Sequence, residues 1–88
     1  MLQKRKECLI CKTPFDLHLH HVFEGNRRKA SDKYGMTVWL CFKHHVGGEG
    51  IHHNTKLDRQ LKAKAQKAFE DVYGHDKFME VFKKNYIE

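Results

Sequence analysis

Two segments in the first half of the chain have the hydrophobic pattern of β-strands. From Phe15 to Phe23 apolar and polar residues alternate, most regularly over Leu17 to His20, and this period of two is typical of a half-buried strand. Met36 to Leu40 is dense in β-branched and aromatic residues, which favour a second strand, and it leads directly into Cys41. We expect the two strands to form a hairpin with a long connection.

The segments around this hairpin are polar. Between the strands, Asn26 to Tyr34 is basic, contains Ser31 and Asp32, and is closed by Gly35. This pattern predicts a loop that leads into a short helical turn with a glycine C-cap. The residues before Cys8 are polar and basic, and we expect them to be a frayed arm.

The second half of the chain has helical periodicity. Thr55 and Asp58 have the spacing of a capping box that opens a helix, and Gly74 ends it. Apolar residues recur at helical intervals in this helix and in a shorter one beyond it: Leu57, Leu61, Ala65, Ala68, Phe69 and Val72, then Phe78, Met79, Val81 and Phe82. We interpret these positions as the core that packs the C-terminal helices onto the hairpin.

Length and charge narrow the class of protein. A chain of 88 residues makes one domain (1–88) whose core alone gives a thin margin of stability, and it has no apolar stretch long enough to span a bilayer. The net charge of +6 indicates an anionic partner, by default a nucleic acid, although a basic surface without a partner remains the alternative. Charge does not separate DNA from RNA. We interpret the basic residues of the longer helix as solvated surface: Arg59, Lys62, Lys64 and Lys67.

Two short motifs have the spacing of metal ligands. Cys8 and Cys11 are separated by two residues, and so are Cys41 and His44, and two such turns supply the four ligands of a tetrahedral structural zinc. We predict that these four residues bind zinc. The alternative is three buried free thiols beside a surface histidine. A disulfide framework is disfavoured because three cysteines leave one unpaired and no signal-peptide pattern precedes them.

The chain has eight histidines, more than a structural zinc requires. His45 and His52 on one straight helix would be separated by about 10.5 Å along its axis, too far to share an ion, but the glycines between them allow the backbone to double back. His20 and His21 are neighbours on a strand and point to opposite faces, which favours one metal ligand and one free imidazole. An imidazole base beside a divalent ion and a basic surface is suited to phosphodiester hydrolysis.

Together these motifs resemble the HNH endonucleases, in the zinc-knuckle branch typical of small phage-type nicking enzymes. The resemblance covers residues 8–54 and rests on Cys8-x-x-Cys11, Leu19-His20-His21-Val22, Leu40-Cys41-x-x-His44-His45 and His52. It implies a small α+β fold: a ββα-metal (His-Me finger) core stapled by a structural zinc, with C-terminal helices (55–88) packed on it. The strands of Val22 and Val38 and a short helix at 42–46 would form that core.

The resemblance also implies roles for the histidines. His20, His45 and His52 would hold a catalytic divalent ion, Mg or Mn and in some members Ni or Zn, and His21 would be the general base. The reaction would hydrolyse DNA to a 5'-phosphate and a 3'-hydroxyl, and a single site would nick one strand. His18 and His53 would be surface residues or contacts of a ligand, and His75 would stand at the start of a helix.

Two positions depart from the family pattern. The family asparagine falls near Met36, which cannot make its side-chain hydrogen bond, and Asn26 or Asn54 would have to replace it. The last two ligand histidines are seven residues apart instead of the usual four, which leaves His52 and His53 as alternatives. We favour His52 because Gly50-Ile51-His52 is similar to a pattern in small phage proteins of this type.

The expected partner is double-stranded DNA. Arg27, Arg28 and Lys29 lie between the strands and are the expected phosphate contacts, with a solvated charge run as the alternative. The protein would act as a monomer or homodimer, without a membrane, in the cytoplasm of a bacterial or phage-infected cell, with a phage terminase or recombination protein as a candidate partner. The competing functions are a non-catalytic zinc-knuckle nucleic-acid-binding module and a zinc-stabilised protein-interaction domain.

Overall fold

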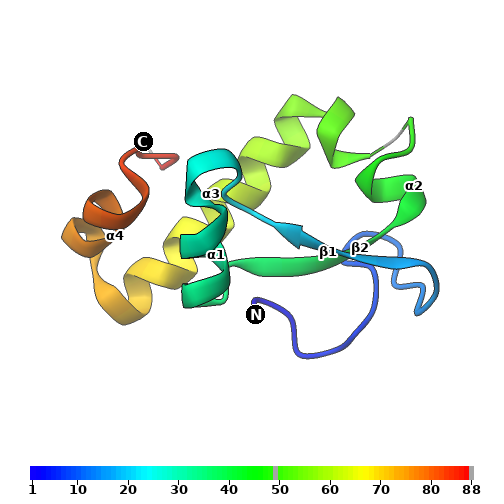
Figure 1. The fold of residues 1–88 in the computed structure, drawn as a ribbon, viewed down its shortest axis with the longest axis horizontal. Coiled ribbons are helices and arrows are strands. Elements are labelled where there is room, and N and C mark those ends of the chain that lie inside the picture. The colour runs from blue at the N-terminus through cyan, green and yellow to red at the C-terminus, as the bar shows by residue number, and fades with distance from the viewer. Residues whose placement is uncertain (49, 88) are drawn as a thin grey trace.

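The computed structural model describes residues 1–48 and 50–87 and has a small α+β architecture (Figure 1). A two-stranded antiparallel sheet is combined with four α-helices and two short 3-10 turns. In chain order the elements are β1 (Leu17–His21), η1 (Gly25–Arg27), α1 (Arg28–Tyr34), β2 (Thr37–Cys41), α2 (Phe42–His45), η2 (Ile51–His53), α3 (Thr55–Tyr73) and α4 (His75–Phe82). None of the helices in the described residues has the length and apolar character needed to cross a membrane.

The predicted hairpin is confirmed, with shorter strands than expected. β1 pairs with β2 so that His20 lies opposite Val38. β1 begins at Leu17 because Asp16 has a left-handed backbone (φ 53°), and Phe15 before it is 72% exposed. The connection contains a complete helix, α1, where only a turn was expected, and Gly35 caps it in the predicted left-handed conformation (φ 70°).

The N-terminal arm is not frayed, which corrects our expectation. The Leu2 N–H donates to the Thr37 carbonyl (3.0 Å) and the Leu9 N–H donates to the Trp39 carbonyl (2.9 Å), so the arm runs along the outer edge of β2. The Gln3 side chain also accepts from the Trp39 N–H. An open strand edge leaves backbone groups unpaired, and the arm satisfies them in this protein.

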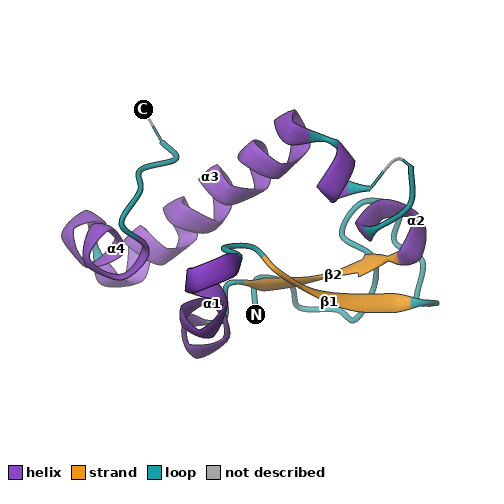
Figure 2. Cartoon of the chain, turned by 45° about the horizontal axis from the view of Figure 1, so that its top comes forward, coloured by secondary structure: helices purple, strands orange, loops and turns teal. Residues whose placement is uncertain are grey.

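The core lies between the hairpin, α1 and the C-terminal helices (Figure 2). The Phe23 ring, just beyond β1, packs against Phe78 and Phe82 of α4, and Phe69 of α3 contacts the same two rings. The buried Ser31 hydroxyl donates to the Phe23 carbonyl (2.7 Å) and accepts from its N–H (3.1 Å), which ties α1 to the end of β1. Most of the predicted core positions are confirmed as buried or partly buried, except Ala68 and Val72, which lie on the exposed face of α3.

The start of α3 differs from the predicted capping box. Asn54 is the N-cap and its Oδ1 accepts from the Leu57 N–H (3.0 Å), whereas Thr55 is already helical. Asp58 instead accepts from Lys62 Nζ (2.7 Å), so Lys62 is partly buried and not fully solvated.

Replacing Asn54 with alanine is expected to lower the free energy of unfolding by about 1 kcal/mol, because the Leu57 N–H loses its side-chain acceptor. Urea denaturation measures the change, and Thr55→Ala is the matched control. Equal losses in the two variants would contradict the assignment of Asn54 as the cap.

Candidate metal centres

The first centre joins the two short motifs. The Sγ atoms of the three cysteines and a ring nitrogen of His44 all lie within 4.8 Å of one another. Cys8 and Cys11 come from a tight turn in which the Lys12 N–H donates to the Cys8 carbonyl (2.9 Å). Cys41 ends β2, and His44 follows it on α2. The hairpin and its N-terminal arm therefore meet at one point.

The distances in this cluster suit a zinc ion. Cys11 Sγ lies 3.7 Å from Cys41 Sγ, and His44 Nδ1 lies 3.3 Å from Cys41 Sγ and 3.7 Å from Cys8 Sγ. Zn–S bonds of about 2.3 Å at tetrahedral angles place two sulfurs about 3.8 Å apart. Cys8, Cys11 and Cys41 are free thiols in the part of the chain that the structure describes. The donor set is compatible with the predicted structural zinc.

The environment of Cys8 favours its thiolate. Burial opposes the charged form, but backbone hydrogen bonds from Cys11, Cys41 and Ile10 outweigh it and lower the Cys8 pKa to about 6. Zinc binds cysteine as the thiolate. The surroundings of Cys8 therefore favour the form that a zinc ion would bind.

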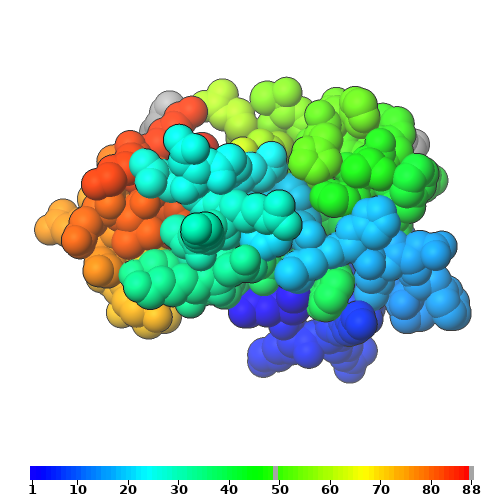
Figure 3. All heavy atoms as spheres, in the orientation of Figure 1, coloured from blue at the N-terminus to red at the C-terminus, as the bar shows by residue number. Residues whose placement is uncertain are grey.

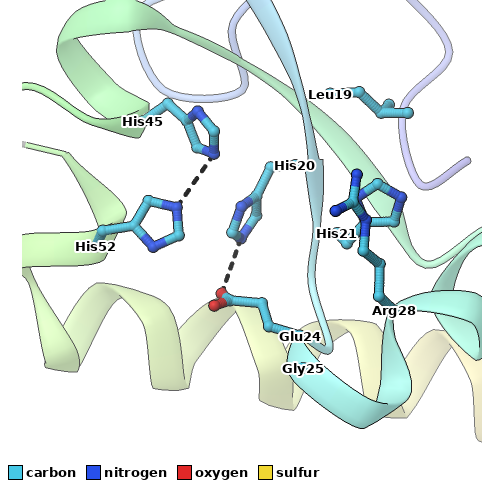
Figure 4. Close-up of a pocket in the computed structure, with 8 residues that line it drawn as sticks. All are labelled: Leu19, His20, His21, Glu24, Gly25, Arg28, His45 and His52. Atoms are coloured by element: carbon cyan, nitrogen blue, oxygen red, sulfur yellow. Dashed lines mark hydrogen bonds and ion pairs between the residues drawn. The ribbon is translucent and has the colours of Figure 1, made fainter.

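The second centre is a cluster of three imidazoles, from β1, α2 and η2. His20, His45 and His52 each offer a ring nitrogen within 4.8 Å of the others, and Nε2 of His45 lies 3.2 Å from Nε2 of His52. Figure 4 shows the three rings turned toward one another. With metal–nitrogen bonds of about 2.1 Å, two ligands of one ion are separated by about 3.0–3.4 Å, so this spacing suits a shared ion.

Glycine turns bring His45 and His52 together. The Gly50 N–H donates to the Gly47 carbonyl (2.8 Å), which reverses the chain between α2 and η2. A Cβ at Gly50 would stand 2.6 Å from the His45 carbonyl oxygen, so no larger residue fits without a shift of the backbone. The structure thus places His52 in the cluster, whereas His53 is exposed and outside it.

His20 is the most buried of the three imidazoles. It is 2% exposed, and its Nε2 has no hydrogen-bond partner among the described residues. Burial, together with the charges of His45 and His52, lowers the His20 pKa to about 4. The ring is therefore neutral at pH 7, as a metal ligand must be. A buried nitrogen without a partner is costly, and a bound divalent ion would satisfy it.

His18 contacts His45 of the three-histidine cluster. Its Nδ1 lies 2.9 Å from Nδ1 of His45, which leaves Nε2 of His45 directed at His52. Residues that bond the outer nitrogen of a ligand histidine fix its tautomer and ring orientation. Of the two roles expected for His18, a surface residue or a contact of a ligand, the structure favours the contact.

Replacing His18 with alanine is expected to weaken divalent-ion binding at the three-histidine cluster about 10-fold to 100-fold, because His45 loses the contact that orients it. Calorimetric titration of the zinc-loaded protein with Ni²⁺ measures the affinity. His53→Ala removes a nearby exposed imidazole and is expected to change nothing; equal affinities in the two variants would disprove the role of His18.

His21 lies on the other side of β1. Figure 4 shows it on the side of Arg28, away from the three-histidine cluster. Its Nε2 lies 2.7 Å from Oδ1 of Asp32 on α1. His21, Arg28 and the three clustered imidazoles nevertheless border one cleft of about 280 Å³, along with Glu24.

Only some of the remaining candidate residues lie at this cleft. Arg28 borders the cleft, whereas Arg27 and Lys29 do not line it. Asn54 is engaged as the cap of α3, and Met36 is buried in the core. His75 is at the start of α4, as expected, with its Nδ1 2.6 Å from Glu70.

Two carboxylates near the site were not predicted from the sequence: Glu24, which borders the cleft, and Asp32, which contacts His21. Asp32 was predicted only as part of a polar loop, and Glu24 was not singled out. Asp32 reaches His21 because α1 folds back beside β1, and no local motif signals that contact. Glu24 stands four residues after His20, just past the end of the strand, and this short interval is the only signal in the sequence.

Comparison of the chain with protein-family models, with curated proteins and with solved structures found no significant match.

Proposed function

We propose that the protein is a metal-dependent HNH-type endonuclease that hydrolyses DNA phosphodiester bonds and nicks one strand. The observation that carries the proposal is the cleft in which three clustered imidazoles, a separate histidine and an arginine meet. A structural role for this combination is not needed, because a zinc ion at the cysteine cluster would already stabilise the hairpin end.

The order of elements supports this assignment. β1 supplies His20 and His21, and α2 follows β2 directly and supplies His45. This is the strand, strand and helix order of the ββα-metal fold that the sequence resembles. The structural zinc would hold the turn of Cys8 against the β2–α2 junction and so keep the ligands in place.

His20, His45 and His52 are the proposed ligands of the catalytic ion. A divalent ion there would neutralise charge on the phosphate and on the leaving oxygen. His20 would bind it as a neutral ring, and His18 would orient His45 toward it.

His21 is the proposed general base. Asp32 accepts the Nε2 proton, which leaves Nδ1 to accept a proton from water. The carboxylate also stabilises the imidazolium that this transfer produces. Asp32 would thus do part of what the family asparagine does and explain how Met36 is tolerated.

The DNA backbone would be bound beside this cleft. Arg28 contacts the proposed scissile phosphate, while Arg27 and Lys29 contact flanking phosphates. Figure 3 shows segment 24–34, in cyan, at the surface in the middle of one face, where a duplex can reach it. One site cuts one strand, so a homodimer or a partner such as a phage terminase would be needed to break both.

The test is incubation of zinc-loaded, otherwise metal-stripped protein with supercoiled plasmid, with Mn²⁺ or Mg²⁺ added back. Open circles are expected only with the added ion, and His20→Ala is expected to abolish them. No conversion with any divalent ion, despite retained DNA binding, would reject the proposal.

A non-catalytic zinc-knuckle nucleic-acid-binding module is the second candidate. The observation that favours it is Met36, 6% exposed in the core at the position where the family has asparagine. This function requires salt-sensitive binding without turnover, and it leaves the three-histidine cluster without a role.

A further inference from the structure

Two carboxylates converge on His20, the most buried member of the three-histidine cluster. Glu24 follows β1, Asp58 lies in the first turn of α3, and each offers an oxygen within 4.8 Å of the other and of a ring nitrogen of His20. Nε2 of His20 lies 3.8 Å from Oε1 of Glu24 (Figure 4). These two acids were not part of the predicted metal site.

The unpartnered nitrogen of His20 points to a ligand at this place. Nε2 is buried and has no hydrogen-bond partner among the described residues, although a carboxylate stands 3.8 Å away. That distance is too long for a hydrogen bond. It is shorter than the maximum of about 4.2 Å between two ligands of one ion whose bonds are about 2.1 Å, so the spacing suits an ion between them.

The surroundings have room for an ion. A hollow of about 170 Å³ is lined by Glu24, Asp58, His52, Ile51 and Thr55, and it adjoins the larger cleft because Glu24 and His52 border both. Lys62 Nζ donates to Oδ2 of Asp58 (2.7 Å), which restrains the position of the carboxylate.

We propose that His20, Glu24 and Asp58 form a second divalent-ion position, which shares His20 with the three-histidine site and selects Mn²⁺ or Mg²⁺. Three neutral imidazoles suit Zn²⁺ and Ni²⁺, whereas carboxylates suit the harder Mg²⁺ and Mn²⁺ and offset their charge. A neutral imidazole has one lone pair, so the two positions are alternatives for one ion. The inference rests on the proposed function in taking His20 as a catalytic ligand.

The test measures metal binding and not cleavage. Zinc-loaded protein is titrated with Mn²⁺, followed by the electron paramagnetic resonance signal of the free ion, and separately with Ni²⁺ by calorimetry. Glu24→Gln and Asp58→Asn are expected to weaken Mn²⁺ binding about 10-fold or more and to change Ni²⁺ binding less than about 3-fold. His52→Ala is expected to show the reverse.

The matched control is Glu80→Gln, which removes the same charge from an exposed position on α4 that pairs only with Lys77 among the described residues. Mn²⁺ affinities of Glu24→Gln and Asp58→Asn equal to that control would overturn the proposal. Equal losses for Mn²⁺ and Ni²⁺ would also overturn it, since they would indicate one site that both acids influence through their charge. A protein that binds Mn²⁺ through Glu24 but cuts no DNA would refute the nuclease and leave this inference standing.

Discussion

Replacing Cys41 with serine is expected to unfold the protein at physiological temperature. A structural zinc contributes roughly 10 kcal/mol or more to the folded state of a small domain, and the total stability of a domain is about 5–15 kcal/mol. Cys41 is 6% exposed and ends β2, opposite Leu17 of β1, so the loss of this ligand also loosens the hairpin. Circular dichroism during thermal unfolding, with zinc content by atomic absorption, measures the effect.

His44→Cys is the matched control for this variant. It replaces one zinc ligand by another that zinc accepts, and it is expected to retain the ion and most of the helical signal. A strong chelator should convert the wild type to the state of Cys41→Ser. A Cys41→Ser protein that melts at the wild-type temperature would instead support the interpretation of three buried free thiols.

The parts of the fold that sequence reasoning predicted are those with local signals. The alternation around Leu17 to His20 and the β-branched run before Cys41 predicted the hairpin, and Gly35 and Gly74 end helices as expected. The two ligand motifs predicted the zinc-like cluster because each is a single turn of chain, and the repeat of the same spacing is improbable by chance.

The parts that were wrong depend on contacts distant in the sequence. The N-terminal arm has the composition of a loose tail, and only the open edge of β2 explains why it is ordered. Asn54 and Thr55 are both good cap residues, and the turn at η2 decides between them. Val72 fits the helical period of α3, but the core ends before it reaches that face.

In the candidate site, too, local features were predicted from the sequence and contacts between distant segments were not. The glycine break correctly indicated that the chain doubles back, which brings His45 and His52 together. No sequence pattern indicated that α1 would carry Asp32 to His21, since the contact spans eleven residues across two elements. The proximity of the clustered side chains was thus predictable from the sequence, whereas the carboxylates around them depend on the tertiary fold.

Replacing His21 with alanine is expected to lower the nicking rate about 10²-fold to 10⁴-fold, the usual contribution of a general base, with the fold and metal affinity retained. The fold should survive because His21 is outside the hydrophobic core and its side chain contacts only the exposed Asp32 among the described hydrogen-bond partners. Surface pairs of this kind contribute about 1 kcal/mol or less. Single-turnover nicking of supercoiled plasmid at saturating Mn²⁺ measures the rate.

Two further variants separate the base from its neighbours. Asp32→Asn keeps an acceptor oxygen beside His21 but removes the charge, so a smaller loss than that of His21→Ala is expected. His53→Ala removes an exposed imidazole next to the proposed ligand His52 and is expected to nick at the wild-type rate. If His21→Ala nicks as fast as His53→Ala, the general base must be another group in the cleft. His20 and His21 point to opposite faces of β1, so β1 would then supply a metal ligand but not the base.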